Sequence, residues 1–250
     1  MNIAILIIVF IFGLVFGSFY NVVGLRLSKN ESIAYPPSHC TSCNHKLKVL
    51  DLVPVISFIF LKGRCRYCNS KISGIYPITE LITGILFALS YYVFGFSYDF
   101  IISILLSSLF SIIFVTDFNF YIIPDEINII FPIIIFIVNI LRLGIKLALI
   151  YLGYSVLIFT FMYLLMLLGN FIFKKESLGG GDIKLMLSLG STLPIMSSMF
   201  SIFLSAFLAL PISIIMYIKN KNKVIPFGPF LVIAFLITFM LKINIIQFLN

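Results

Sequence analysis

Two aspartates lie at the edges of apolar stretches, where a charged side chain is costly. Asp117 ends one apolar run, and Asp182 follows Gly179, Gly180 and Gly181 at the start of another. A carboxylate that reaches the middle of a membrane costs about 2.5–3.5 kcal/mol, so its presence indicates a task. Two carboxylates that share one site do not both ionise readily, and such an acid and base pair can activate water against a peptide carbonyl. The pair therefore predicts aspartyl-protease chemistry.

The residues around Asp182 suit a peptide substrate. Because the three glycines have no side chains, an extended substrate backbone can approach them and form hydrogen bonds. We predict that Lys184, two residues after Asp182, also supports substrate binding. The unpaired N–H groups of a helix start favour an anion, which predicts that Asp182 is ionised and Asp117 protonated. The alternative is that Asp182 is a plain N-cap and Asp117 an interfacial polar residue.

Four cysteines form two Cys-x-x-Cys pairs, namely Cys40, Cys43, Cys65 and Cys68. The 21 residues between the pairs are close to the spacing at which two thiolate knuckles bind a tetrahedral zinc ion. Four thiolates complete the coordination of the metal, so we expect a structural zinc that supplies folding energy to a small polar segment. The alternative is two disulfides, which a reducing cytosol disfavours. His39 and His45 flank the first pair and are either substitute ligands or solvated neighbours.

The composition requires that membrane helices position these residues. Of the 250 residues, 61% are hydrophobic and 10% are charged, whereas a soluble domain has about 25% charged residues. A large soluble catalytic domain is thereby excluded. The sequence predicts an all-α polytopic membrane protein with about eight transmembrane helices, over residues 3–23, 77–95, 100–116, 127–141, 147–172, 184–198, 199–218 and 226–247.

One stretch allows two interpretations. Within residues 184–218, Gly190, Ser191 and Pro194 mark either a turn between two helices or a kink in one long helix.

A polar segment after the first helix divides the chain into three expected parts: helix 1 over 1–25, a cytoplasmic zinc-binding insert over 26–76 and a membrane peptidase domain over 77–250. Lys and Arg accumulate on the cytoplasmic side of membrane proteins. An N-terminus outside the cell places 14 of the 17 basic residues inside, together with Asp117 and Asp182. The net charge of +8 is explained by anchoring to anionic lipid, with no nucleic-acid partner.

Three further acids flank the expected helices. Asp125 and Glu126 follow Pro124 and are expected to start the fourth helix. Glu80 lies just inside the second apolar run. It is either a first-turn acid or it faces a binding site for a cationic ligand.

Six short motifs occur in order along nearly the whole chain. They are Gly17-Ser-Phe-Tyr-Asn-Val-Val-Gly-Leu-Arg26, the two Cys-x-x-Cys pairs, Tyr76-Pro-Ile-Thr-Glu80, Asp117 with Ile123-Pro-Asp125, Gly179-Gly-Gly-Asp-Ile-Lys-Leu185 at the Gly-x-Gly-Asp position, and Pro226-Phe-Gly-Pro229. Each is weak alone, but the ordered set is specific. With it the chain resembles the type IV prepilin peptidases, bifunctional membrane enzymes also called leader peptidases/N-methyltransferases.

The resemblance implies a GxGD-type aspartic peptidase of the bacterial cytoplasmic membrane, with Asp117 and Asp182 as its catalytic pair. Such an enzyme removes the leader of type IV prepilins or related pseudopilins of secretion systems after a glycine, on the cytoplasmic side. The resemblance also implies methyl transfer from S-adenosylmethionine to the new α-amine, with Gly63 at a position linked to that activity and Glu80 in the same region. Asn119 stands where many relatives carry another acid, which leaves Asp117 without a rival.

Two other classes of function remain open at this point. An ion-coupled transporter can also keep paired acids beside a glycine-broken helix, but it should show a duplicated half, and the sequence shows no internal repeat. A non-catalytic scaffold whose zinc knuckle binds a secretion ATPase leaves both aspartates unexplained.

Overall fold

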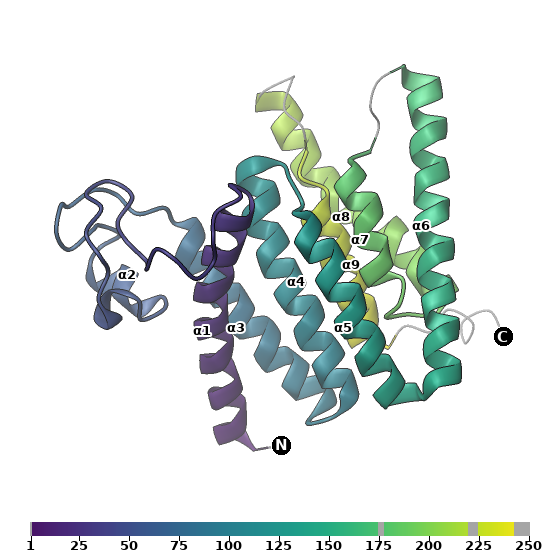
Figure 1. Cartoon of the computed structure of the whole chain (residues 1–250), viewed down its shortest axis with the longest axis horizontal. Coiled ribbons are helices and arrows are strands. Elements are labelled where there is room, and N and C mark those ends of the chain that lie inside the picture. The colour runs from purple at the N-terminus through teal and green to yellow at the C-terminus, as the bar shows by residue number, and fades with distance from the viewer. Residues whose placement is uncertain (1, 175–177, 220–224, 243–250) are drawn as a thin grey trace.

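The protein is a bundle of apolar helices with a polar insert beside it (Figure 1). The computed structural model describes residues 2–174, 178–219 and 225–242. The bundle helices are α1 (Ile3–Leu27), α3 (Ile75–Phe94), α4 (Tyr98–Phe120), α5 (Asp125–Leu143), α6 (Ile145–Phe173), α7 (Gly180–Leu189), α8 (Ile195–Lys219) and α9 (Gly228–Met240). The insert, residues 28–74, holds the short helix α2 (Ile56–Phe60) and one 3₁₀ turn, η1 (Val49–Asp51). The all-α prediction is confirmed.

The number of membrane-spanning helices differs from the expected eight. Among the described residues, six helices are long and apolar enough to cross a membrane: α1, α3, α4, α5, α6 and α8. The other two are shorter than the roughly 20 residues that a span needs, since α7 has 10 residues and α9 has 13. Residues 243–247 of the last expected helix lie outside the described residues. The structure therefore supports six spans and does not confirm eight.

The stretch from 184 to 218 contains a turn and not a kink. The helix α7 ends at Leu189, and α8 begins only at Ile195. At Gly190 the chain touches α6 so closely that an added Cβ would lie 2.8 Å from the Cα of Ser155. Pro194 directly precedes α8, where its missing N–H costs nothing. This turn makes α7 a short helix with Asp182 near its start.

Close contact between α1 and α3 fixes the side of the bundle that carries the insert. A Cβ on Gly13 would lie 2.7 Å from the Cα of Gly84, and one on Gly17 would lie 2.7 Å from the Cα of Glu80. Small residues allow membrane helices to approach in this way. The contact holds Glu80 of α3 directly against α1.

Hydrogen bonds between hydroxyl groups join α1 and α3 to the central helix α4. The three pairs are Tyr20 with Ser108 at 2.7 Å, Thr83 with Ser111 at 2.7 Å and Ser90 with Ser103 at 2.8 Å. The helix α4 also packs against α5 and α9, and side chains such as Ile102, Leu106 and Ile113 are completely buried. Polar pairs and close packing of this kind hold membrane helices together.

The helices alternate in direction, so the helix ends that carry the two aspartates and the insert lie on one side of the bundle. The C-terminal ends of α1, α4, α6 and α8 lie at the same end of the bundle as the N-terminal ends of α3, α5, α7 and α9 (Figure 1). The insert leaves α1 and returns to α3 at that end. Asp117 and Asp182 are therefore brought to the end of the bundle that bears the insert.

Candidate active site and metal centre

Asp117 lies buried in the last turn of α4. Its Oδ2 accepts a hydrogen bond of 3.1 Å from the backbone N–H of Gly228, the first residue of α9. The helix ends three residues later because Tyr121 has a left-handed backbone, with φ of 57°. Asn119 turns back on its own helix and donates to the Val115 carbonyl. Asp117 is thus the acid that the end of α4 supplies to the site.

Asp182 lies buried in the first turn of α7. It is not the N-cap, because Gly179 occupies that position and makes no side-chain cap bond. Its Oδ2 lies over Gly179, where an added Cβ would be 3.1 Å away. Its Oδ1 is buried and has no hydrogen-bond partner among the described residues. An unpaired buried carboxylate oxygen is costly, so Asp182 retains an acceptor for a water or substrate.

The structure brings the two aspartates together. Their charges are close enough to interact, although the two aspartates are 65 positions apart in the sequence. Ile123, in the turn after α4, is the common contact: a Cβ on Gly181 or on Gly228 would lie 3.0 Å from its side chain. Close approach at these two glycines allows α7 and α9 to converge on Asp117.

The other residues near Asp182 have separate roles. Gly179 and Gly180 are exposed, and a Cβ on Gly180 would meet nothing within 4 Å, so the backbone there is accessible. Lys184 forms an ion pair of 2.7 Å with Asp125 on the surface, which joins α7 to α5. Asp125 and Glu126 occupy the first turn of α5, as predicted.

The two Cys-x-x-Cys pairs fold into turns with the same hydrogen bonds. The N–H of Cys40 donates to the His45 carbonyl at 3.0 Å, and the N–H of Cys65 donates to the Ser70 carbonyl at 2.9 Å. The residue after each pair is an asparagine in the left-handed region, which Asn tolerates; these residues are Asn44 and Asn69. The insert therefore holds two equivalent knuckles.

The four thiols form a cluster whose dimensions fit a tetrahedral metal ion. Their Sγ atoms all lie within 4.8 Å of one another, and those of Cys40 and Cys68 are 3.8 Å apart. Sulfurs at about 2.3 Å from a tetrahedral zinc are about 3.8 Å apart. The expected alternative of two disulfides is not found, because all four cysteines are free. The cluster can hold a metal ion.

The electrostatics of the cluster also favour a cation. Backbone N–H groups of Cys43 and then Ser42 lower the pKa of the Cys40 thiol to about 6. A hydrogen bond from His45 favours the Cys43 thiolate, but desolvation and the sulfurs of Cys68 and Cys40 oppose it and raise the pKa of Cys43 to about 11. A positive ion between the sulfurs would offset this repulsion and favour the thiolate form.

Neither histidine belongs to this cluster. The ring of His45 contacts that of Tyr67, with 3.7 Å between centroids and a tilt of 32°, which joins the two knuckles. The Nδ1 of His39 lies 3.1 Å from the Pro37 carbonyl oxygen. Both are neighbours of the cysteine cluster and not members of it.

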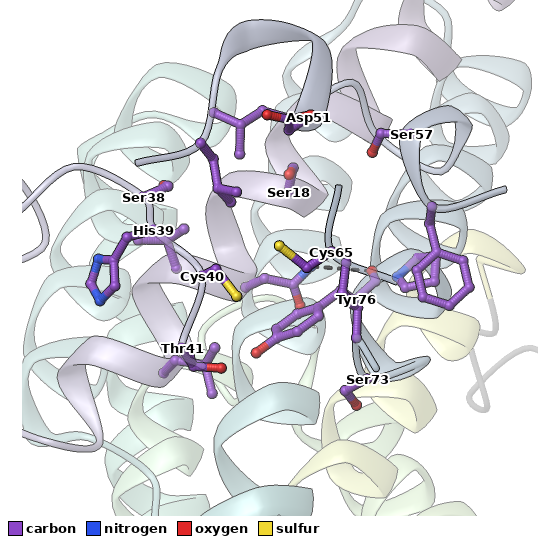
Figure 2. Close-up of a pocket in the computed structure, with 18 of the residues that line it drawn as sticks. Ser18, Ser38, His39, Cys40, Thr41, Asp51, Ser57, Cys65, Ser73 and Tyr76 are labelled. Atoms are coloured by element: carbon purple, nitrogen blue, oxygen red, sulfur yellow. Dashed lines mark hydrogen bonds between the residues drawn. The ribbon is translucent and has the colours of Figure 1, made fainter. Parts of the chain in front are cut away.

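A cavity of about 740 Å³ lies between the insert and the adjoining ends of α1 and α3 (Figure 2). Cys40 and Cys65 border it from the knuckles, and Tyr76 borders it from α3. Its walls carry charges of both signs, from Arg26, Lys29, Lys71, Glu31, Asp51 and Glu80. Such a space suits a small ligand with several charged groups.

Glu80 lines this cavity and holds the insert to the bundle. Its Oε2 accepts a hydrogen bond of 2.7 Å from the N–H of Val55. Val55 immediately precedes α2 and has φ of 59°, a strained conformation for a β-branched residue. Glu80 is not a first-turn acid, because α3 begins five residues earlier at Ile75. Its carboxylate instead fixes the start of α2.

Gly63 acts on the same short helix. Its φ of +68° is in the left-handed region, and an added Cβ would lie 3.0 Å from the ring of Phe58 in α2. Phe58 lines the cavity, whereas Gly63 does not. Gly63 is therefore placed to affect the cavity through Phe58.

Two other side chains hold the walls of the cavity in place. Desolvation opposes ionisation of Asp51, but hydrogen bonds from the Lys48 N–H, Arg66 and Tyr67 outweigh it and lower the pKa of that carboxyl. Arg26 is buried and donates to three backbone carbonyls of the segment after α1, those of Ser32, Ile33 and Pro36.

Sequence reasoning missed the structural parts played by Arg26 and Gly228. A cation at the end of an apolar helix is usually interpreted as a sign of membrane orientation. For this reason the hydrogen bonds of Arg26 to the insert were not predicted. Gly228 was visible only as one member of a short motif.

Comparison with known proteins identifies the family of the chain. Residues 11–94 match the bacterial peptidase A24 N-terminal domain, and residues 104–214 match the type IV leader peptidase family. The prepilin leader peptidase/N-methyltransferase of Bacillus subtilis (strain 168) is 32% identical over 244 residues, with 96% of each chain covered. The chain belongs to the type IV leader peptidase family.

Other relatives agree with this membership. The prepilin leader peptidase/N-methyltransferase of Aeromonas hydrophila is 30% identical over 262 residues, which cover 91% of this chain and 87% of that protein. The one from Neisseria gonorrhoeae is 29% identical over 249 residues, which cover 90% and 86%. A search of solved structures gave no match. The resemblance is confirmed, and the chain is a multi-pass membrane peptidase with N-methyltransferase activity.

Proposed function

We propose that the protein removes the leader of type IV prepilins or pseudopilins after a glycine, at the cytoplasmic face of the membrane, and then methylates the new N-terminal amine. The observation that carries the peptidase proposal is the buried pair of Asp117 and Asp182, which two distant helices bring together. The names of its relatives supply the substrate class.

The geometry suits a two-carboxylate mechanism. The N–H of Gly228 fixes the orientation of Asp117, and Asp182 keeps an unpaired Oδ1. One carboxylate takes a proton from water as the water attacks the scissile carbonyl, and the other carboxyl group protonates the carbonyl oxygen. The leaving amine takes up a proton as the tetrahedral intermediate collapses. That Asp117 is the protonated partner stays a prediction.

The cytoplasmic placement is supported by the distribution of basic residues. The insert, with Lys46, Lys48 and Arg64 among its cations, adjoins the same end of the bundle as both aspartates (Figure 1). Cytoplasmic segments are enriched in Lys and Arg. Both reactions then take place on the side where the insert lies, with the N-terminus outside.

The cavity beneath the insert is the proposed site of methylation. S-adenosylmethionine supplies the methyl group, and it carries a carboxylate, an ammonium and a sulfonium. The cavity offers Lys29 and Lys71 for an anion and Glu31 and Glu80 for cations, with Phe58 as an apolar surface. Its volume of about 740 Å³ lies within the usual range for small-molecule sites, about 300–1,000 Å³. The Glu80 carboxylate is also placed to attract an α-ammonium group.

The cysteine cluster is the proposed site of a structural zinc ion. Four thiolates at tetrahedral spacing complete its coordination, so it does not activate water. Its task is to hold the two knuckles together beside the cavity, because the insert has only one buried hydrophobic residue, Cys65, within the described structure.

The test is to incubate the purified protein in detergent with a prepilin and S-adenosylmethionine and to weigh the products. We expect the prepilin to lose its leader and the mature peptide to gain one methyl group at its N-terminus. The Asp117→Asn protein is the control and should leave the prepilin intact. An unchanged prepilin with the folded wild-type protein would contradict the proposal.

A further inference from the structure

Asn128 is a buried polar residue without a partner. It lies in the first turn of α5 and is 6% exposed. Neither its Nδ2 nor its Oδ1 has a hydrogen-bond partner among the described residues. An unsatisfied buried polar group costs about 1–3 kcal/mol, and such groups in native proteins call for an explanation.

The orientation of Asn128 follows from a second asparagine on the same helix. Asn139 donates from Nδ2 to the Ser191 carbonyl at 2.7 Å, just beyond the end of α7. Eleven residues are about three helical turns, and both asparagines are buried. They therefore lie on the same side of α5, although Pro132 lies between them in the helix. Since α5 and α7 pack together and run in the same direction (Figure 1), Asn128 faces the first part of α7.

The level of Asn128 along the bundle matches that of Asp182. From Asn139 to Asn128 the helix rises about 16.5 Å, and from Ser191 back to Asp182 the rise is about 13.5 Å. The ion pair between Lys184 and Asp125 fixes the same register at the upper end of the two helices. Asn128 therefore faces the start of α7 within about one turn of Asp182.

We infer that Asn128 binds the backbone of the peptide substrate next to the scissile bond. This inference rests on the proposed peptidase function. A primary amide offers both a donor and an acceptor, as the edge of an extended peptide does, and it adds no charge beside two acids. Nδ2 donates to one substrate carbonyl, and Oδ1 accepts from one substrate N–H. The exposed backbone of Gly179 and Gly180 gives the same strand of substrate a way to approach.

The test compares cleavage and stability of two matched variants. Asn128→Leu removes both polar atoms at similar volume, and we expect kcat/KM for prepilin cleavage to fall about tenfold or more. Because no internal hydrogen bond is lost, its melting temperature in detergent should stay level or rise. The control Asn139→Leu loses the bond to Ser191 and should melt earlier, with the kcat/KM of its folded fraction near that of the wild type.

Substrates with single backbone esters show whether the contact is direct. An ester replaces one N–H by oxygen, and we expect one ester position near the cleavage site to slow the wild type about tenfold. The same ester should cost Asn128→Leu nothing further. Asn128→Ser serves the same comparison if the leucine variant does not fold.

Three outcomes are distinguishable. Wild-type rates in folded Asn128→Leu, or equal ester penalties in both proteins, would overturn the inference and leave a buried water molecule as the partner of Asn128. A wild-type protein that cleaves no prepilin would overturn the proposed function, and with it this inference.

Discussion

The backbone N–H of Gly228 donates a hydrogen bond of 3.1 Å to Oδ2 of Asp117, which lies 111 residues earlier in the chain. The start of α9 thereby holds one of the two candidate catalytic carboxyl groups. An added Cβ at this point would lie 2.9 Å from the Ile113 side chain and 3.2 Å from the Asp117 carboxylate, so these neighbours would have to shift.

We predict that Gly228→Ala lowers the rate of leader removal about tenfold or more. The added methyl group must displace its neighbours Ile113, Ile123 and Asp117 or the start of α9 itself. Small displacements of catalytic groups are costly. The matched control is Gly153→Ala in α6, where a Cβ meets nothing within 4 Å. Initial rates of prepilin cleavage for both variants, normalised to folded protein, give the measurement. A folded Gly228→Ala protein that cleaves normally would show that the hydrogen bond is dispensable.

Asp117→Asn and Asp182→Asn should each abolish leader removal while the protein still inserts and folds. An amide cannot accept the proton of the attacking water or alternate between the two charge states. Asp125→Asn is the control, since it removes only an exposed ion pair with Lys184 worth about 0–1 kcal/mol. Gel analysis of prepilin processing distinguishes these outcomes. Near-normal processing by either catalytic variant would remove that residue from the mechanism.

The purified protein should contain one zinc ion per chain, and Cys68→Ser should lose it. The four Sγ atoms are already within 4.8 Å of one another, and loss of one ligand opens the coordination sphere. We expect the insert to unfold, whereas the helices persist because their backbone hydrogen bonds lie within each span. Elemental analysis without added metal and circular dichroism check both parts. Metal-free protein with two intact disulfides would exclude the zinc site.

Much of this arrangement could be predicted from local sequence. Long apolar runs forecast the bundle helices, and the spacing of the cysteines indicated their cluster, because both depend on neighbours in the chain. The membrane count was less accurate, since α7 has apolar composition but ends at Leu189, where Gly190 must touch α6. Composition does not record such a tertiary contact.

The supporting residues of both sites could not be predicted. The partner of Asp117 is a backbone N–H in a distant helix. Every residue except proline has such a group, so the side-chain types in the sequence do not indicate this bond. Glu80 was left between two interpretations, and the structure shows that it binds the strained Val55 backbone. Asn128 resembles any polar residue in an apolar run until its burial and lack of partners are known.

Replacing Gly63 by leucine should reduce methylation more than cleavage. A side chain at φ of +68° is strained, and its Cβ would press on Phe58, which lines the cavity. The aspartate pair lies on α4 and α7, away from this contact. The measurement compares methyl incorporation with leader removal in the same preparation, and Gly74→Leu, whose Cβ would meet nothing within 4 Å, is the control. Equal losses of both activities would mean that Gly63 supports the whole protein.

The two activities should separate in the Asp182→Asn protein. Every residue that lines the cavity lies between Ser18 and Glu80, whereas the aspartates belong to α4 and α7. Methyl transfer needs a held donor and a neutral amine but no activated water. Asp182→Asn should therefore fail on full-length prepilin yet methylate a peptide supplied already cleaved, with its N-terminal amine free. Methyl incorporation into this peptide is measured at neutral to mildly alkaline pH. There an α-amine with an unperturbed pKa of about 7.7–8.0 is partly deprotonated. If the folded variant cannot methylate that peptide, the cavity and the aspartate pair form one coupled site.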